Sequence, residues 1–326
     1  FCDREPLLSL QVFGHQSKLM ALIRAFAAAA LAGLVPISSS LKTNYGIQAQ
    51  NEEDSSRILP SLYSQRPPVP GPFHVDPNGG LTVVIMGYTD KTSMTRSVCH
   101  HASMVPLVHQ VLLVWNDNET DLWTEGVDCP AGERAPIKVL QQKYNTLLNR
   151  YAVWPEVQTE GVLLLDDDVL MSGMSNLTKM FKIWQKHPTQ VVGLWGNCPY
   201  KQDGKFLYVY HNCQEHFSIT TGQGNMVHRN YMQMFMAKQP MKMLEFMYTQ
   251  RPTCEDVALS FLASNHTGLP PLVTPDVWED VGDSIDRVEM HWSFGTREDW
   301  LSLRGACMDK FVEWYGRDPL APTLPA

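Results

Sequence analysis

The sequence has little positive charge, few cysteines and no long apolar run. Its 26 Lys and Arg residues are outnumbered by 34 Asp and Glu residues, which gives a net charge of −8 at pH 7. This balance excludes a general nucleic-acid binder, because such proteins need a basic surface to neutralise phosphates. No apolar run reaches about 18 residues without a charge, so a protein with several membrane spans is excluded as well.

Seven cysteines are too few for a small protein built on a disulfide framework, and no CxxC pair of the zinc-ribbon kind occurs. Hydrophobic residues make up 44% of the chain and aromatic residues 10%, which is enough to form a core and excludes wholesale disorder. A length of 326 residues fits one large domain or two small ones. The composition therefore predicts an acidic globular protein of enzyme size.

The first 37 residues have the pattern of a signal peptide or signal anchor. Lys18 and Arg24 precede the apolar run Ala25–Val35, and a proline and small serines follow it. An Ala-rich amphipathic helix is the alternative interpretation, and the pattern leaves cleavage open. We expect a protein of the secretory pathway, in the lumen of the endoplasmic reticulum or Golgi. It would be a single-pass type II membrane protein if the segment is retained as an anchor.

Residues 38–80 are rich in Ser, Asn, Gln, Pro and Gly, and they predict a flexible stem, because they bury too little apolar surface to offset their ordering entropy. The folded domain is expected over residues 81–320, with a short tail at 321–326.

Within the folded part, continuous apolar runs alternate with helix-like segments. The expected strands are Leu81–Met86, Val111–Trp115, Ile137–Leu140 and Gly161–Leu165. The expected helices are Thr92–His109, ending at Pro106, then Leu147–Trp154, and Leu177–His187 with Asn176 as its cap. This alternation predicts an α/β fold with a mostly parallel sheet that is covered on both faces.

Ligands of such sheets bind beyond the carboxyl ends of the strands. The Tyr88–Lys91 loop, Asn116 and Asp166 follow strands, so we expect them to face one crevice. Asp166, Asp167 and Asp168 repel one another unless they share a cation. Mg²⁺ and Mn²⁺ prefer such oxygen ligands and leave positions for substrate phosphates. The triplet therefore favours a metal-bound diphosphate over the alternative, an acidic turn with an Asp helix cap.

The sequence resembles the exostosin-like glycosyltransferases (glycosyltransferase family 64) over about Leu81–Leu320. The resemblance depends on an ordered set of motifs, each weak alone and specific together. They are Val114-Trp115-Asn116, Asn149-Arg150 with Trp154–Val157, Leu163–Asp168, Ile183–Gln185, Cys254–Asp256, Ser260–Leu262, Gly268–Pro271, Cys307-Met308, Phe311, Trp314–Gly316 and Pro319-Leu320.

The resemblance implies a glycosyltransferase A-type fold, with a single Rossmann-like sheet and a mixed C-terminal region on the acceptor side. It implies a metal-dependent enzyme that transfers N-acetylhexosamine from a UDP-sugar with retention at the anomeric carbon. Asp168 matches the Mn²⁺ ligand, and Asp166 and Asp167 match contacts to ribose and donor sugar. The positions that match contacts to uridine and diphosphate are Asn116, Asn145, Arg150 and Lys91. The last replaces the family's usual arginine, which keeps the charge and loses the bidentate geometry.

Asp256 matches the candidate catalytic carboxylate of the family, and Glu255 stands where the family often has Asp. The alternative for both is favourable charge at a helix N-terminus. Arg304 matches an arginine that helps to neutralise the leaving UDP, with a solvated helix face as the alternative. The resemblance also implies a disulfide between Cys254 and Cys307. A carboxylate opposite the leaving group and a same-face mechanism both remain open.

Other features carry weaker expectations. A second disulfide would join Cys198 and Cys213 across the hairpin-like stretch Pro199–Asn212, and Cys99 and Cys129 would pair or stay reduced. Sequons at Asn118, Asn176 and Asn265 permit a luminal location. Gly222–Asn225 is expected to form either a loop over the donor sugar or a plain turn. The Met-rich segment Met226–Met247 is expected to pack in the core. Structural roles are expected for His211, His216 and His228.

Two other functions are alternatives to the transferase. One is a catalytically inactive sugar- or nucleotide-binding scaffold on the same fold. The other is a metal-dependent phosphotransferase, which the lack of a second carboxylate cluster and of a Gly-rich phosphate loop disfavours. The sequence leaves the donor sugar open, as well as the choice between a glycan and a glycolipid acceptor and the formation of a homodimer.

Overall fold

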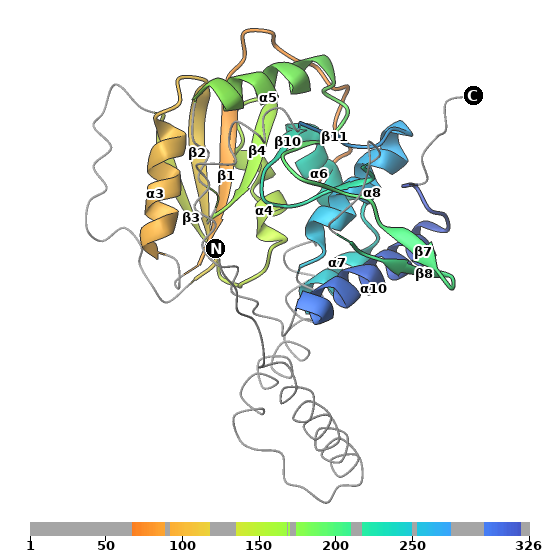
Figure 1. Cartoon of the computed structure of the whole chain (residues 1–326). Coiled ribbons are helices and arrows are strands. Elements are labelled where there is room, and N and C mark those ends of the chain that lie inside the picture. The colour runs from red at the N-terminus through yellow and green to blue at the C-terminus, as the bar shows by residue number, and fades with distance from the viewer. Residues whose placement is uncertain are drawn as a thin grey trace, which may run out of the picture. The chain divides into compact units, whose positions relative to one another are not determined.

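The computed structural model describes residues 67–88, 92–117, 135–167, 169, 174–209, 217–249, 253–274 and 297–320 (Figure 1). The predicted signal segment, the first part of the predicted stem and the tail lie outside these residues. Among the described helices, none is both long enough and apolar enough to cross a bilayer.

A seven-stranded sheet forms the centre of the domain, in the order β11-β5-β10-β4-β1-β2-β3. Its strands are β1 (Leu81–Gly87), β2 (Val108–Trp115), β3 (Ile137–Gln141), β4 (Gly161–Asp166), β5 (Val192–Gly193), β10 (Asn225–His228) and β11 (Leu272–Val273). β4, β1, β2 and β3 run parallel, and β10 lies antiparallel between β4 and β5. The predicted α/β fold with a mostly parallel sheet is therefore confirmed.

Helices cover both faces of this sheet (Figure 1). They are α3 (Thr92–Ser103), α4 (Asn149–Ala152), the 3₁₀ helix η2 (Trp154–Glu156), α5 (Met174–Lys186), α6 (Arg229–Lys238), α7 (Met241–Thr249), α8 (Glu255–Thr267) and α10 (Arg297–Tyr315). Alternate residues of β1 face opposite sides: Val83 and Ile85 belong to the core under α3 and α5, and Val84 belongs to the core under α6 and α8. Every residue of β1 is buried, as expected for a strand covered on both faces.

The helix expected over Thr92–His109 ends at Ser103, so its predicted end is wrong. β2 begins at Val108, earlier than the expected strand start at Val111, because Val108 pairs with Leu81 of β1. Pairing with the central strand thus extends β2 beyond its apolar run.

The second expected helix, Leu147–Trp154, is a single turn of α4 followed by the 3₁₀ helix η2. Pro155 lies in η2, where its missing N–H prevents the α-helix from continuing. α5 begins at Met174, so Asn176 lies inside the helix and is not its cap. The predicted core role of the Met-rich segment holds for most of its methionines, although Met241 is exposed.

Two small sheets lie between β5 and β10 along the chain. They are β6 (Gly196–Asn197) with β9 (Ile219–Thr220), and the hairpin of β7 (Tyr200–Gln202) with β8 (Lys205–Leu207). The hairpin lies beside α10 (Figure 1), and the Phe206 backbone N–H donates to Asp309 Oδ1 at 3.0 Å. A Cβ on Gly305 would lie 2.5 Å from the Phe206 carbonyl oxygen. Only glycine therefore lets α10 approach the hairpin this closely.

Residues 67–80, the last part of the predicted stem, form no helix or strand but contact the domain. The Gln233 side chain donates to the Pro68 carbonyl oxygen at 2.7 Å, and His74 lies 2.6 Å from Glu160. This segment thus lies against the domain before the chain enters β1.

His228 has the structural role expected for it. Its Nδ1 accepts from the Asn230 N–H at 3.0 Å and caps α6, and its Nε2 donates to the His74 carbonyl oxygen at 2.7 Å. These two bonds require the neutral ring, and burial lowers the pKa of His228. His211 and His216 lie outside the described residues.

The remaining cysteines and sequons are partly described. Cys198 is disulfide-bonded and Cys99 is a buried thiol, whereas Cys129 and Cys213 lie outside the described residues. The sequon residues differ in exposure, since Asn176 is buried and Asn265 is exposed, and Asn118 is outside the described part.

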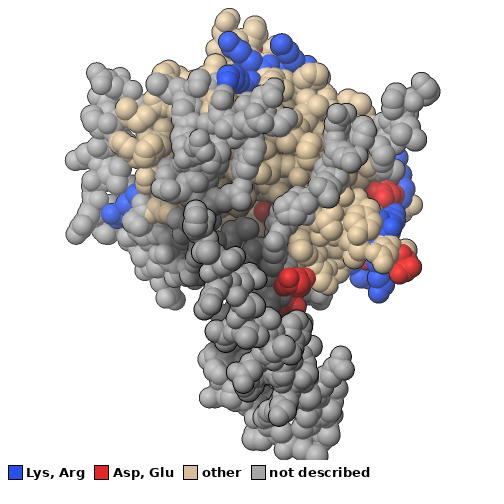
Figure 2. Space-filling model, in the orientation of Figure 1, with Lys and Arg blue, Asp and Glu red and all other residues tan. Residues whose placement is uncertain are grey.

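Charged side chains lie in separate groups on the face drawn in Figure 2, with basic and acidic residues mixed along one edge. Exposed ion pairs include Lys138–Glu156 and Lys310–Glu313, at 2.5 and 3.0 Å. Exposed pairs contribute about 0–1 kcal/mol each, because water screens them. The stability of the domain therefore depends on its core and on the buried polar cluster described next.

Candidate active site

Polar residues follow β2 and β4 at the same edge of the sheet. Asp166 is the last residue of β4 and pairs with Met86 of β1, and Asn116 comes directly after β2. The Asn116 amide is buried, donates to the Thr146 carbonyl oxygen at 3.2 Å and accepts from Asn149 Nδ2 at 2.9 Å. Asn116 thereby fixes the loop that leads into α4.

Arg150 extends from α4 to this edge and is 1% exposed. It forms an ion pair with Asp166, donates to the Gly222 carbonyl oxygen at 3.2 Å, and lies 3.8 Å from Glu255 Oε1. Burial lowers the pKa of Arg150, but Asp166 and Glu255 outweigh it, so the pKa lies above its ordinary value. Arg150 is thus a permanent buried positive charge between two carboxyl groups.

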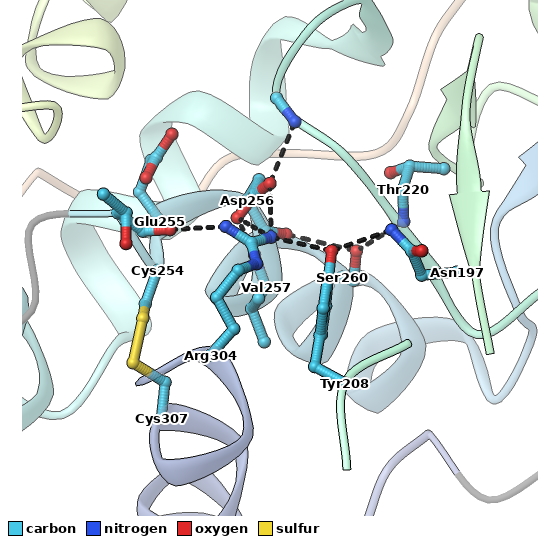
Figure 3. Close-up of polar contacts among 12 residues, drawn as sticks. Asn197, Tyr208, Thr220, Cys254, Glu255, Asp256, Val257, Ser260, Arg304 and Cys307 are labelled. Carbon is cyan, nitrogen blue, oxygen red and sulfur yellow. Dashed lines mark hydrogen bonds and ion pairs between the residues drawn. A yellow bond between two sulfur atoms is a disulfide. The ribbon is translucent and has the colours of Figure 1, made fainter. Parts of the chain in front are cut away.

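Asp256, in the first turn of α8, accepts four hydrogen bonds (Figure 3). Gly222 N–H donates to Oδ2 at 2.9 Å and Val257 N–H donates to Oδ1 at 2.7 Å. Arg304 Nη2 lies 2.7 Å from both carboxylate oxygens. The carboxylate therefore joins the start of α8, the turn at Gly222 and α10.

Arg304 comes from α10 and is 2% exposed. Besides Asp256, it donates to the Thr253 carbonyl oxygen at 2.6 Å and to the Tyr208 hydroxyl at 3.0 Å. Its guanidinium carbon lies 4.5 Å from the centre of the Tyr208 ring and 4.6 Å from that of Trp300, a cation–π arrangement. Arg304 is therefore not on a solvated helix face, which was the alternative interpretation of this residue.

Glu255 precedes Asp256 and is equally buried, at 4% exposure. Its side chain points away from Arg304 in Figure 3, and its Oε2 has no hydrogen-bond partner. Burial raises the pKa of Glu255 to about 8, with further increases from Asp256 and Asp166 and opposition from Arg150 and Arg304. This carboxyl group is thus protonated more readily than an ordinary glutamate.

The turn at Gly222–Gly224 lies against these charged groups. A Cβ on Gly222 would lie 3.1 Å from Arg150 Nη1 and 3.4 Å from Glu255 Oε1. A larger residue here would press on both side chains. Glycine leaves room for its N–H to donate to Asp256 and for its carbonyl oxygen to accept from Arg150. Gly222–Asn225 is therefore a turn, and its first residue belongs to the site.

A disulfide joins Cys254 and Cys307, with a Cα–Cα distance of 6.4 Å. It connects the residue before Glu255 to a residue three positions after Arg304. The bridge thus holds α8 and α10 together beside the Asp256–Arg304 ion pair.

The structure places the predicted site residues in different ways. It brings together five charged residues, Arg150, Asp166, Glu255, Asp256 and Arg304. Asp167 follows Asp166 in the chain, and its side chain is buried. Asn145 is exposed in the loop before α4. Lys91 and Asp168 lie outside the described residues.

Tyr208 and Trp300 are contacts of Arg304 that the sequence did not indicate. Trp300 lies four residues before Arg304 on α10, so helical spacing alone would have made the two neighbours. Tyr208 is distant in the chain, and only the presence of a buried arginine, which needs aromatic or anionic neighbours, would have suggested a search for it.

The chemistry of the Asp166–Asp168 triplet fits a hard divalent ion, because all its ligands would be carboxylate oxygens. Asp166 already pairs with Arg150, so a cation would depend more on the other two carboxylates. Among the described residues, no group of three or more His, Cys, Asp or Glu side chains could hold a metal ion.

The glycosyl transferase family 64 domain matches residues 81–324 of this chain. Mouse exostosin-2 is 28% identical over 260 residues, which cover 74% of this chain and 33% of that protein. Mouse exostosin-like 2 is 28% identical over 257 residues, 74% of each chain. Glucosamine inositolphosphorylceramide transferase 1 of Arabidopsis thaliana is 26% identical, over 72% of this chain and 30% of its own length. The chain thus spans about a third of the longer relatives.

Among solved structures, the mannosyltransferase PcManGT from Pyrobaculum calidifontis in complex with GDP-Man and Mn²⁺ matches with a TM-score of 0.40 at 12% identity. The match covers 73% of this chain and 65% of that one. A similarity of this size says nothing about the site.

Proposed function

Since the chain belongs to glycosyltransferase family 64, we propose that it transfers an N-acetylhexosamine from a UDP-sugar to a glycan or glycolipid acceptor. The reaction would depend on a divalent metal and retain the anomeric configuration. The observation that supports this most strongly is the continuous set of contacts from Asp166 through Arg150 and Gly222 to Asp256. These contacts join the end of β4, where ligands of such sheets bind, to the two buried carboxyl groups at the start of α8.

In this proposal, Asp168 holds Mn²⁺, and Asp166 and Asp167 contact the ribose and the donor sugar. When bound, the metal would neutralise charge on the diphosphate. Lys91, Asn116, Asn145 and Arg150 form the nucleotide side. Because Arg150 and Asn116 are buried and bonded to protein groups, they act by holding the nucleotide-binding loops in place.

The second half of the proposed site comprises Glu255, Asp256 and Arg304. The Asp256 carboxylate would stabilise the positive charge that develops on the sugar carbon as its bond to the diphosphate breaks, and Arg304 would help to neutralise the leaving UDP. Water has little access to these side chains, since none is more than 4% exposed. Poor access favours transfer to an acceptor over hydrolysis.

The location proposed for the enzyme is the lumen of the Golgi or endoplasmic reticulum. The disulfide Cys254–Cys307 supports it, because disulfides persist in oxidising compartments. The proposed N-terminal signal or anchor, residues 1–37, lies outside the described residues.

A panel of radiolabelled UDP-sugars, with and without Mn²⁺, tests this function on the whole chain. We expect release of UDP from one UDP-N-acetylhexosamine, and we expect EDTA and Asp168→Ala each to abolish it. Glu313→Gln, an exposed carboxylate on α10, is the control and should leave turnover unchanged. No turnover of any UDP-sugar would contradict the proposal, and UDP binding without transfer would favour an inactive scaffold.

A further inference from the structure

The strap, residues 67–77, crosses the edge of the sheet opposite to Asp166 and is held through its backbone. It runs past Glu160, which precedes β4, and past His228, the last residue of the antiparallel strand β10. Its prolines have no N–H with which to pair as a strand, so side chains from α5 and α6 donate to its carbonyl oxygens instead. These bonds are Gln185 to Pro77 at 3.1 Å, Asn230 to Gly71 at 3.0 Å and to Pro72 at 3.2 Å, and Gln233 to Pro68 at 2.7 Å.

Phe73 is the apolar anchor of the strap. Its ring is half-buried against the core, with centroid distances of 4.8 Å to His228, 4.9 Å to Tyr231 and 5.4 Å to His266. Burial lowers the pKa of His266, and Lys238 acts in the same direction. The anchor therefore packs against histidine rings that are harder to protonate than an ordinary histidine.

His228 connects the strap to the start of α6. Its Nε2 donates to the His74 carbonyl oxygen, and its Nδ1 accepts from the Asn230 N–H. A second proton on the ring would lie at Nδ1, where it meets this N–H, and α6 would lose its cap. Burial lowers the pKa of His228 most. The bond to the His74 carbonyl oxygen and the charge of Glu160 oppose this change, whereas Arg229 and His74 add to it. The observed bonds thus need the neutral form of His228.

His74 depends on the opposite protonation state. Its Nδ1 lies 2.6 Å from Glu160 Oε1, and the Asp76 N–H donates to the other oxygen of that carboxylate. Glu160 raises the pKa of His74 through the hydrogen bond and through its charge, and Asp76 adds to the rise. The strap gains an ion pair when His74 is protonated, and it keeps only a neutral hydrogen bond when His74 is not.

We propose that the strap is a pH-dependent clasp, which closes on the domain when His74 is protonated and His228 is neutral. The inference goes beyond the proposed function and does not depend on it. The contribution of neutral His228 is present above pH 6.5 and is lost as the pH falls through its lowered pKa. The contribution of protonated His74 is present below pH 6.5 and is lost as the pH rises through its raised pKa. The strap is therefore held most firmly near pH 6.5, and compartments that differ in acidity would hold it differently.

The test is hydrogen exchange followed by mass spectrometry on the whole chain, from about pH 5 to about pH 8. The measured quantity is the protection of the peptide that covers the strap, corrected for the intrinsic exchange rate at each pH. We expect this protection to be highest near pH 6.5. It should fall about 2- to 10-fold towards pH 5, the equivalent of one net hydrogen bond. Towards pH 8 it should fall by a smaller factor, because His74 is exposed and water screens its ion pair.

Two variants separate the histidines. His228→Asn should remove only the fall on the acidic side, because an Asn side chain accepts from the Asn230 N–H at every pH and takes up no proton. His74→Gln should remove only the fall on the alkaline side, because Gln donates to Glu160 without ionising. His187→Gln is the matched control, since it removes an exposed histidine after α5 and should leave the wild-type profile unchanged.

Two results would overturn the inference. One is a wild-type strap whose corrected protection is the same at every pH. The other is a pH profile that both His228→Asn and His74→Gln retain, because other groups would then control the strap. A chain that turns over no UDP-sugar would contradict the proposed function and leave this inference intact, since exchange of the strap is measured without substrate.

Discussion

The parallel part of the sheet and the α8–α10 region contribute to the same site, but different forces hold them. β1, β2 and β4 are stabilised by ladder pairing and continuous apolar burial. The α8–α10 region depends on a buried ion pair, two aromatic rings around a guanidinium, and a disulfide. Apolar burial tolerates small changes in shape, whereas a buried charge tolerates no loss of its partner. The second region is therefore the more sensitive to single substitutions.

The largest effect is expected from Arg304→Ala. This change leaves the buried Asp256 carboxylate without its ion-pair partner, and breaking such a pair costs about 3–5 kcal/mol. That is a large fraction of the stability of an ordinary domain, about 5–15 kcal/mol. Urea unfolding followed by circular dichroism measures it.

Two controls sharpen this first prediction. Ile85→Val in β1 removes one buried methylene and should cost about 0.5–1.5 kcal/mol with turnover preserved. Lys310→Ala removes an exposed cation from the same helix as Arg304 and should cost under about 1 kcal/mol. If Arg304→Ala lowered the free energy of unfolding by no more than Ile85→Val does, the two regions would not differ in their sensitivity to substitution.

Removal of the disulfide should have a somewhat smaller effect. The bridge spans 53 residues, and a loop of this length restricts the unfolded chain by about 4 kcal/mol on the entropic account. Removing a native disulfide typically costs about 2–5 kcal/mol. The urea midpoint of the double variant Cys254→Ala/Cys307→Ala should therefore fall well below that of Cys99→Ala, which loses only a buried thiol. Equal midpoints would show that the bridge does not stabilise α8 against α10.

An intermediate effect is expected where the two regions meet, at Gly222. Gly222→Ala places a methyl group 3.1 Å from Arg150 Nη1, and such overpacking costs about 1–3 kcal/mol. We expect lower kcat/KM for the UDP-sugar along with the lower stability. Gly71→Ala is the matched control, because a Cβ there meets nothing within 4 Å. Full activity of Gly222→Ala would mean that the turn does not set the position of Arg150 or Glu255.

The smallest effect is confined to a pH window. The pKa of Glu255 is raised from 4.5 to about 8, so the native state binds the proton more tightly than the unfolded state. Its contribution to stability is complete below pH 4.5 and is lost as the pH rises through about 8. Glu255→Gln cannot ionise, so its melting temperature should fall less than that of the wild type across this window. If the melting temperatures of both proteins fell equally between pH 4.5 and about 8, the raised pKa of Glu255 would be contradicted.

The sequence predicted the sheet region well, because the information there is local. A strand such as Gly161–Asp166 shows itself as an apolar run, and the sheet rule then places Asp166 at the ligand edge. The errors occurred where neighbours in space decided the outcome. Val108 joined β2 because Leu81 was beside it, and no local pattern contains that fact.

For the α8–α10 region, the sequence indicated which residues belong to the site but not how they are arranged in space. Family resemblance pointed to Glu255, Asp256 and Arg304, but periodicity alone suggested helix-end charge and a solvated face. Two partners that decide the chemistry come from distant segments, Gly222 from a turn and Tyr208 from beyond a hairpin. Such contacts arise only when the chain is folded.

The antiparallel direction of β10 has a consequence for how the site is assembled. Because β10 runs against β4, the segment that precedes it reaches the same edge as the segments that follow the parallel strands. Gly222 therefore reaches Asp256 from a stretch that lies outside the ladder of β1, β2, β3 and β4, and the parallel strands stay uninterrupted.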